Sequence, residues 1–294
     1  MMAAIDPVGA LLRWLNAIDP PARALIGCAH AALPPVSADA IGVRLVGCVV
    51  DAGVDLPAQL LAAGIGRVEV VACPERPGAA ADRTREWVRT LDGVAAVAAD
   101  PHRRGHRSGP TFDLAHPALP RRLALGLGEP PLRLPFDPAL PERDRALAAL
   151  RVLADAGRAH LPESAGEEGD PAATLLAASG CTACGVCVRA CPHDALVLDL
   201  ADGVSTLRHL RDACRGDLAC VRLCPERALA PAGVLTLLDV AREGTRELAA
   251  VSTRACRRCG TQHPVADGEL CPTCTFRATS AFGSRLPPGT RPPG

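Results

Sequence analysis

The stretch "CTACGVCVRACP" (181–192) organises the chain, because it holds four cysteines at the spacing C-x2-C-x2-C-x3-C followed by proline. A second stretch, "CRGDLACVRLCP" (214–225), repeats the pattern with one change, since Asp217 stands where the second cysteine would be. The cysteines of the two stretches are Cys181, Cys184, Cys187, Cys191, Cys214, Cys220 and Cys224. Cysteines this close together, in a chain without a secretion signal, are typical of metal ligands rather than disulfides. Zinc is an alternative, but it leaves the third cysteine of the first run and its proline unexplained.

The spacing suits a cubane iron–sulfur cluster, because two-residue gaps let one tight loop reach three iron corners. The fourth cysteine then begins a short helix that carries it toward another cluster. The stretch "CPHDALVL" (191–198) is similar to "CPERALAP" (224–231), so the two cysteine runs and the residues after them form an internal repeat. In these features the chain resembles bacterial dicluster ferredoxins, which have an α+β ferredoxin-like fold. The resemblance implies a first 4Fe–4S cluster on Cys181, Cys184, Cys187 and Cys224, and a second cluster on Cys191, Cys214, Asp217 and Cys220.

Asp217 is the one departure from the cysteine pattern. A carboxylate binds iron, but it is a harder ligand than thiolate and its bond is less covalent. Some members of the ferredoxin family have aspartate at this position, which implies either a 4Fe–4S cluster with a labile iron or a 3Fe–4S cluster. The alternative is a degenerate site that stays empty, but the three remaining cysteines at correct spacing argue against it.

Two further cysteine pairs, in "CRRCG" (256–260) and "CPTC" (271–274), have the spacing C-x2-C-x11-C-x2-C. Each pair forms a tight knuckle whose two thiolates face one ion, as in a small zinc ribbon. The predicted zinc ligands are Cys256, Cys259, Cys271 and Cys274. A single iron, as in rubredoxins, is an alternative, although the gap is short for that family and its usual aromatic residues are missing. A third interpretation is that these four cysteines bind no metal.

The first hundred residues alternate apolar runs with helical patterns. The runs "RALIGC" (23–28), "VRLVGC" (43–48) and "RVEVVAC" (67–73) predict buried strands, and a helix is expected between the last two. Another helix is predicted at "AADRTREWVRTL" (80–91). This order predicts an α/β Rossmann-like domain with a parallel sheet.

Cys28, Cys48 and Cys73 each close one of these runs. The ends of parallel strands share one edge of a sheet, where ligands commonly bind. The stretch from 47 to 78 resembles the delta subunit of methyl-viologen-reducing hydrogenases, which implies a two-iron cluster on such cysteines. This chain lacks the extra cysteines expected there, and His30 is a candidate for a missing ligand. The alternative is that the three cysteines are small buried hydrophobes.

Composition divides the chain into five predicted segments: an α/β domain (1–100), a Pro/Arg-rich linker with one helix (101–172), the dicluster domain (173–232), a helix with the zinc ribbon (233–280) and a disordered tail (281–294). Acidic and basic residues balance at 32 each, which argues against a nucleic-acid partner. No run reaches the roughly 20 apolar residues of a membrane span. A cytoplasmic location, where thiols stay reduced, is expected.

These features predict an electron-transfer protein without a catalytic site of its own. It would serve as a subunit or redox partner of a larger oxidoreductase, such as a hydrogenase, a formate dehydrogenase or a related molybdoenzyme. An accessory or assembly factor for an iron–sulfur or molybdenum enzyme is the main alternative. A regulator whose ribbon contacts nucleic acid is a third, against which the neutral charge counts.

Overall fold

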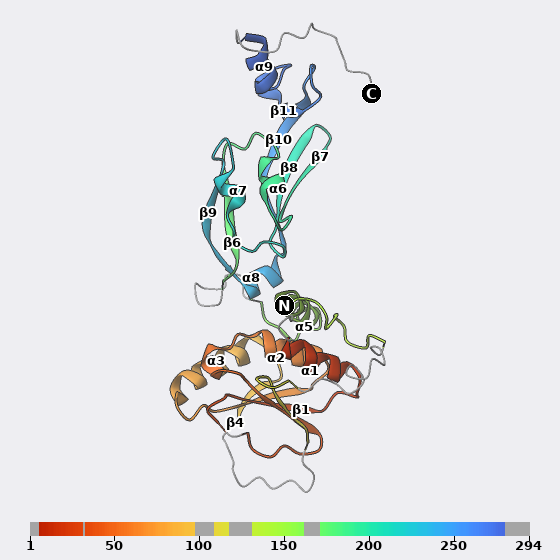
Figure 1. The fold of residues 1–294 in the computed structure, drawn as a ribbon, viewed down its shortest axis with the longest axis vertical. Coiled ribbons are helices and arrows are strands. Elements are labelled where there is room, and N and C mark those ends of the chain that lie inside the picture. The colour runs from red at the N-terminus through yellow and green to blue at the C-terminus, as the bar shows by residue number, and fades with distance from the viewer. Residues whose placement is uncertain (1–5, 32, 98–108, 118–130, 162–170, 280–294) are drawn as a thin grey trace. The chain divides into compact units, whose positions relative to one another are not determined.

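The computed structural model describes residues 6–31, 33–97, 109–117, 131–161 and 171–279. The chain divides into two compact units, residues 1–170 and 171–294, both drawn in Figure 1. The predicted tail (281–294) and the end of the predicted linker (162–170) lie outside the described residues. Within the described part, no helix is long and apolar enough to cross a membrane.

The first unit is built on a parallel sheet, which confirms the prediction for this region. The strands stand in the order β4-β3-β1-β2-β5, and every neighbouring pair runs parallel. Their bounds are β1 (Arg23–Gly27), β2 (Ala40–Arg44), β3 (Arg67–Val71), β4 (Val94–Val97) and β5 (Thr111–Asp113). The three central strands are buried along most of their length, so they appear in the sequence as continuous apolar runs.

The helices of the first unit are α1 (Pro7–Asn16), the short η1 (Val49–Asp51), α2 (Asp55–Ala62), α3 (Pro77–Thr90) and α5 (Glu142–Asp155). Figure 1 shows α1, α2 and α3 along one side of the sheet. The crossovers β2–α2–β3 and β3–α3–β4 both lead toward the β4 edge. Because such crossovers are right-handed, both helices must cover the same face.

The connection from β1 to β2 leads in the opposite direction, toward the β5 edge. The right-handed rule therefore places it over the other face of the sheet. Leu33 and Val36 of this connection pack against Leu25 of β1 and Val71 of β3. The chain thus leaves two adjacent strands, β1 and β3, toward opposite faces.

The stretch predicted as a linker contributes to this unit. β5 pairs with β2, and Phe112 of β5 contacts Trp14 of α1 with ring centroids 4.6 Å apart. Leu134 and Phe136 are buried. The predicted helix of this stretch is α5, which packs on α2. Short apolar pieces between prolines carry no periodicity, so the sequence pattern did not indicate β5.

The second unit contains two antiparallel sheets. One pairs β6 (Pro171–Ala178) with β9 (Leu229–Thr236), and the other has the order β11-β10-β8-β7. The remaining strands are β7 (Leu196–Ala201), β8 (Val204–Leu210), β10 (Thr245–Ala255) and β11 (Gln262–Pro264). The helices are α6 (Val186–Ala190), α7 (Ala219–Arg222), α8 (Leu237–Arg242), η2 (Val265–Asp267) and α9 (Pro272–Thr279).

Two local predictions need correction. The strand predicted at 43–48 starts earlier and ends at Arg44, because its pairing with β1 stops where β1 ends at Gly27. The helix predicted after 233 is the short α8, and the chain then forms the long strand β10. β10 pairs with β8 on one stretch and with β11 on another, so it links the hairpin β7–β8 to the C-terminal cysteines.

Candidate metal centres

The first predicted ligand set lies around one cavity of the second unit. Cys181, Cys184 and Cys187 line it from the first cysteine loop, and Cys224 lines it from the second. The rest of the wall is largely apolar and includes Leu198, Leu207 and Leu229. The cavity encloses about 350 Å³, including the part open to solvent. The structure therefore brings together all four residues of this set, here called site one.

The second predicted set lines a separate cavity of about 290 Å³, here called site two. Cys214, Asp217 and Cys220 come from the second loop, and Cys191 comes from the end of the first. Each site thus takes three ligands from one loop and one from the other. Sequence spacing alone cannot show this exchange, because it depends on α6 and α7 lying side by side.

The backbones of the two loops repeat one another, including where they are left-handed. Ala183 and Gly185 flank Cys184 with φ of 54° and 70°. Gly216 and Leu218 flank Asp217 in the same way, with φ of 80° and 58°. A left-handed leucine is sterically unfavourable, so its presence indicates that the surrounding loop imposes the conformation. Asp217 therefore occupies the backbone position that Cys184 occupies in the first loop.

The cysteine that each loop gives to the other site is held by a repeated hydrogen bond. The backbone N–H of Ala195 donates to Cys191 Sγ at 3.3 Å, and that of Ala228 donates to Cys224 Sγ at 3.2 Å. The residues before these donors, Asp194 and Arg227, both have φ of 51°. Amide donors of this kind stabilise a thiolate, the form that binds metal.

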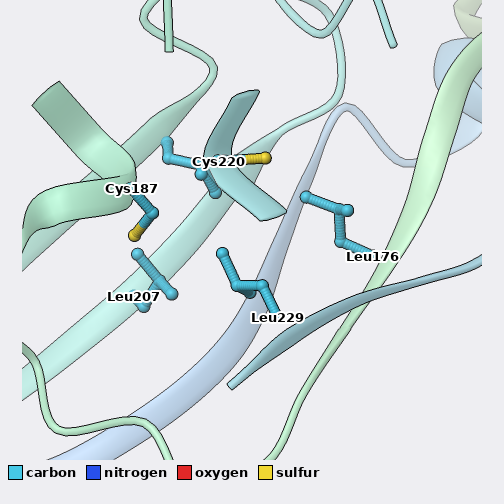
Figure 2. Packing of buried hydrophobic residues seen from close by; sticks show 6 residues of the cluster. Leu176, Cys187, Leu207, Cys220 and Leu229 are labelled. Carbon is cyan, nitrogen blue, oxygen red and sulfur yellow. The ribbon is translucent and has the colours of Figure 1, made fainter. Parts of the chain in front are cut away.

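An apolar core separates the two sites. It consists of Leu176, Cys187, Leu196, Leu207, Cys220 and Leu229. Figure 2 shows Cys187 beside Leu207, while the sulfur of Cys220 points away from that of Cys187. Burial, with the nearby thiols of Cys181 and Cys184, raises the pKa of the Cys187 thiol to about 11. At neutral pH this thiol keeps its proton unless a metal takes the sulfur.

Site two also has a polar group that the sequence pattern did not indicate. His209 of β8 lines the cavity and is 1% exposed, and its Nε2 has no hydrogen-bond partner. Burial and the neighbouring Arg211 lower the pKa of His209 to about 4, so the ring is neutral at pH 7. A buried donor without a partner is unfavourable. The sulfur atoms of a cluster would accept from Nε2–H, so the residues of site two fit an iron–sulfur cluster.

The cysteines near the C-terminus converge more tightly than those of sites one and two. The sulfurs of Cys256, Cys259, Cys271 and Cys274 all lie within 4.8 Å of one another. The Cys259 and Cys271 sulfurs are 3.7 Å apart, and Zn–S bonds of about 2.3 Å at tetrahedral angles imply about 3.8 Å. The arrangement is a four-cysteine group that suits one ion, and it is called the C-terminal site below.

Local amides favour the thiolate of Cys256, whereas burial raises the pKa of the Cys271 and Cys274 thiols. The backbone N–H of Cys271 donates to Cys256 Sγ at 3.3 Å. Burial opposes ionisation of Cys256, but donors from Cys271, Cys259 and Arg258 outweigh it and lower the pKa of this thiol to about 6. Zinc is a possibility that this geometry suggests.

The three cysteines at the strand ends of the first unit are also brought together. Cys48 Sγ and Cys73 Sγ are 3.6 Å apart, and all three side chains are buried. Cys28, His30 and Cys73 have donor atoms within 4.8 Å of one another. Side chains from three segments far apart in sequence therefore meet at one edge of the sheet.

Comparison with known proteins identifies one family model and one relative. Residues 180–228 match the family model described as the 4Fe-4S dicluster domain. A ferredoxin of Pyrobaculum islandicum is 41% identical over 64 residues, which cover 22% of this chain and 57% of that protein. The chain thus spans little more than half of this relative. Both matches support a ferredoxin-type segment with 4Fe–4S clusters. The residues that match the family model all lie within the second unit.

Proposed function

We propose that this protein is a ferredoxin-type electron carrier that passes electrons through two iron–sulfur clusters to a larger oxidoreductase. The observation that carries the proposal is the pair of sites that exchange one ligand each. Site one is lined by four cysteines, and site two by three cysteines and Asp217. A cluster in each site would take up and release one electron with little change in its geometry.

The residues around the two sites differ in polarity. The wall of site one is mostly apolar, which disfavours charge on a bound group and lowers its reduction potential. The wall of site two includes Asp217 and the N–H donor of His209. A donor to sulfur favours the reduced form and raises the potential. The two sites therefore differ in potential, which gives electron flow a direction.

The exchange of ligands also keeps the sites adjacent. Cys187 of α6 and Cys220 of α7 belong to one buried core, so the two cavities share a wall of packed side chains. This wall excludes water between the sites. We assign Cys181, Cys184, Cys187 and Cys224 to a 4Fe–4S cluster, and Cys191, Cys214, Asp217 and Cys220 to a 4Fe–4S or 3Fe–4S cluster.

The oxidoreductase of which this protein is a subunit or partner is proposed to be a hydrogenase, a formate dehydrogenase or a related molybdoenzyme. The ferredoxin-like match covers only 22% of the chain, which leaves most of the chain for other tasks. The parallel α/β unit and the four-cysteine module, with zinc in a structural role, would dock the carrier onto that enzyme. These parts would also set its specificity for one partner.

The test is reconstitution of the full chain with iron and sulfide in the absence of air. Iron and sulfide analysis should give about seven to eight irons in the ferredoxin segment, and redox titration should resolve two one-electron steps. Cys187→Ser should remove the step of site one, and Cys220→Ser that of site two. Four irons or fewer would overturn the two-cluster proposal. Transfer of whole clusters to an apo-enzyme, without electron transfer, would favour an assembly factor instead.

A further inference from the structure

The sheet edge of the first unit holds a cluster of metal-binding side chains that the proposed function does not use. Cys28 follows β1, Cys73 follows β3, and Cys48 precedes η1. Cys28 and Cys73 are fully buried and Cys48 is 6% exposed. His30 lies beside them with its Nδ1 3.9 Å from Cys73 Sγ.

Sheet topology explains why a ligand site would form here. β1 and β3 are neighbours, but the chain leaves them toward opposite faces of the sheet. In open α/β sheets, ligands bind at the carboxyl ends of the strands where the direction of the connections reverses. Cys28 is the first residue after β1, and Cys73 is the second residue after β3.

The distances between the donor atoms suit ligands of one metal ion. The 3.6 Å between Cys48 Sγ and Cys73 Sγ is close to the about 3.8 Å expected for two thiolates on one tetrahedral zinc. The donors of Cys28, His30 and Cys73 fall within the same 4.8 Å limit as the four cysteines of the C-terminal site. Cys48 lies outside this group of three and adjoins it through its contact with Cys73. Among the described residues, the ligands of sites one and two belong to no group this compact.

The surrounding groups fit an anionic, thiolate-rich metal site. His30 Nε2 lies 3.6 Å from the Glu75 carboxylate, the partner that commonly orients a metal-binding imidazole. The backbone N–H groups of Glu75 and Arg76 lie near Cys73, and that of His30 lies near Cys28. The Arg76 guanidinium lies near Cys48 and pairs with Asp51 at 3.1 Å.

We propose that Cys28, Cys48, Cys73 and His30 bind one thiophilic divalent cation, with Zn²⁺ as the reference ion. Three thiolates and one imidazole complete a tetrahedral shell, so no position is left for a substrate. The ion joins the end of β1, the β2–η1 loop and the end of β3, and so stabilises the sheet edge. The proposal is independent of the clusters in the second unit.

The test uses the full chain carrying Cys256→Ser and Cys271→Ser, which remove the ion of the C-terminal site. We expect one zinc per chain to remain after dialysis, and zinc X-ray absorption should show three sulfur ligands and one nitrogen. Cys73→Ser in this background should remove that zinc. His30→Gln should increase its rate of loss to a chelator about tenfold, whereas His116→Gln, a control at a histidine with an 86% exposed side chain, should not.

If Cys73→Ser fails to fold, alkylation of the thiols provides a second test of the single-ion site. In the otherwise wild-type background, Cys28, Cys48 and Cys73 should react with an alkylating reagent faster after zinc is chelated. No zinc in the double variant, or unchanged alkylation after chelation, would overturn the proposal. A mass lower by two hydrogen atoms would show a Cys48–Cys73 disulfide instead. Iron with an equal amount of extra sulfide would show a two-iron cluster, and both results would refute a single-ion site.

Discussion

The carboxylate of Asp217 lies 2.9 Å from Nε2 of His193, and the two residues belong to different halves of the internal repeat. His193 follows Cys191 and Pro192, so it stands next to the cysteine that the first loop gives to site two. Both side chains are partly exposed, at 40% and 43%. Asp217 thus pairs with His193 and also lines the cavity of site two.

Replacing Asp217 should change only site two. As an iron ligand, the carboxylate is bound less covalently than a thiolate, so the iron it holds is the first to be lost on oxidation. Oxidised wild-type protein should show a three-iron signal in low-temperature magnetic resonance. Asp217→Cys should suppress this signal, and Asp217→Ala should give the three-iron form from the start. Site one provides the internal control, and an identical signal in all three proteins would show that Asp217 is not a ligand.

Removing His193 should make the fourth iron of site two more labile. Without the contact to Nε2, Asp217 would rotate more freely and hold the iron less often. His193→Ala should therefore speed conversion to the three-iron form several-fold in a timed oxidation. His160→Ala is the matched control, since His160 forms a similar exposed pair with Asp92 at 3.3 Å. Equal rates in the two variants would show that His193 does not position Asp217.

His209→Leu should lower the reduction potential of site two. The change removes a side-chain N–H donor from its wall, and a net hydrogen bond of about 0.5–1.5 kcal/mol corresponds to about 20–60 mV for one electron. Because the pKa of His209 is about 4, the ring stays neutral from pH 6 to pH 8, and the shift should be the same across that range. Redox titration of both sites would check this, with site one unchanged. A shift that grows as the pH falls would instead indicate a charged ring.

Cys271→Ser should release the ion from the C-terminal site. The substitution removes one of four thiolates, and a module this small depends on its metal for folding. Metal analysis should show the loss of one equivalent, and hydrogen exchange in β11 and α9 should become faster. Thr275→Ser is a suitable control, because it lies on α9 and keeps its hydroxyl, which bonds to the Leu270 carbonyl at 3.5 Å. If the ion proves to be iron with a rubredoxin-like absorption, the site is redox-active rather than structural.

Asp6→Asn should destabilise the first unit. Asp6 accepts from the backbone N–H of Gly9 at 2.9 Å and forms an ion pair with Arg145, whose side chain is fully buried. Asparagine preserves the helix cap, so the variant isolates the loss of the ion pair, about 1–3 kcal/mol. The only two tryptophans, Trp14 and Trp87, lie in this unit, so their fluorescence during urea unfolding reports on it. Asp19→Asn is the control, because Asp19 is 94% exposed and should contribute little.

The same variant should show a defined dependence on pH. Burial raises the pKa of Asp6, but the hydrogen bond from Arg145 and the Gly9 amide outweigh it, so the net pKa lies below the ordinary value of 3.8. A carboxylate with a lowered pKa contributes its full stability above pH 4, and the contribution is lost as the pH falls through its folded value. The difference between wild type and Asp6→Asn should therefore shrink only below pH 4. A difference that shrinks between pH 7 and pH 5 would contradict this assignment.

Much of the second unit could be predicted from sequence because its ligands are close together in the chain. Cys181, Cys184 and Cys187 are separated by two residues each, and a loop that short has few ways to place three thiolates. The repeat in the second loop then identified Asp217 as the counterpart of Cys184, and the matching left-handed residues around both support that alignment. The parallel order of the first sheet also followed from local patterns, since buried strands are apolar along their whole length.

Tertiary structure alone decided which distant side chains meet. No motif in the sequence surrounds His209 or His193. The packing of β8 places His209 in the wall of site two, and the packing of the second loop places Asp217 beside His193. The sequence predicted that Cys28, Cys48 and Cys73 share one sheet edge, but each is also compatible with a small buried hydrophobe. Only the tertiary structure shows Cys73 beside Cys48 at 3.6 Å and grouped with Cys28 and His30. When all the ligands lie in one short loop, their spacing in the sequence determines the site. When ligands come from separate strands, the pairing and direction of those strands determine it, and neither is encoded in any short stretch of sequence.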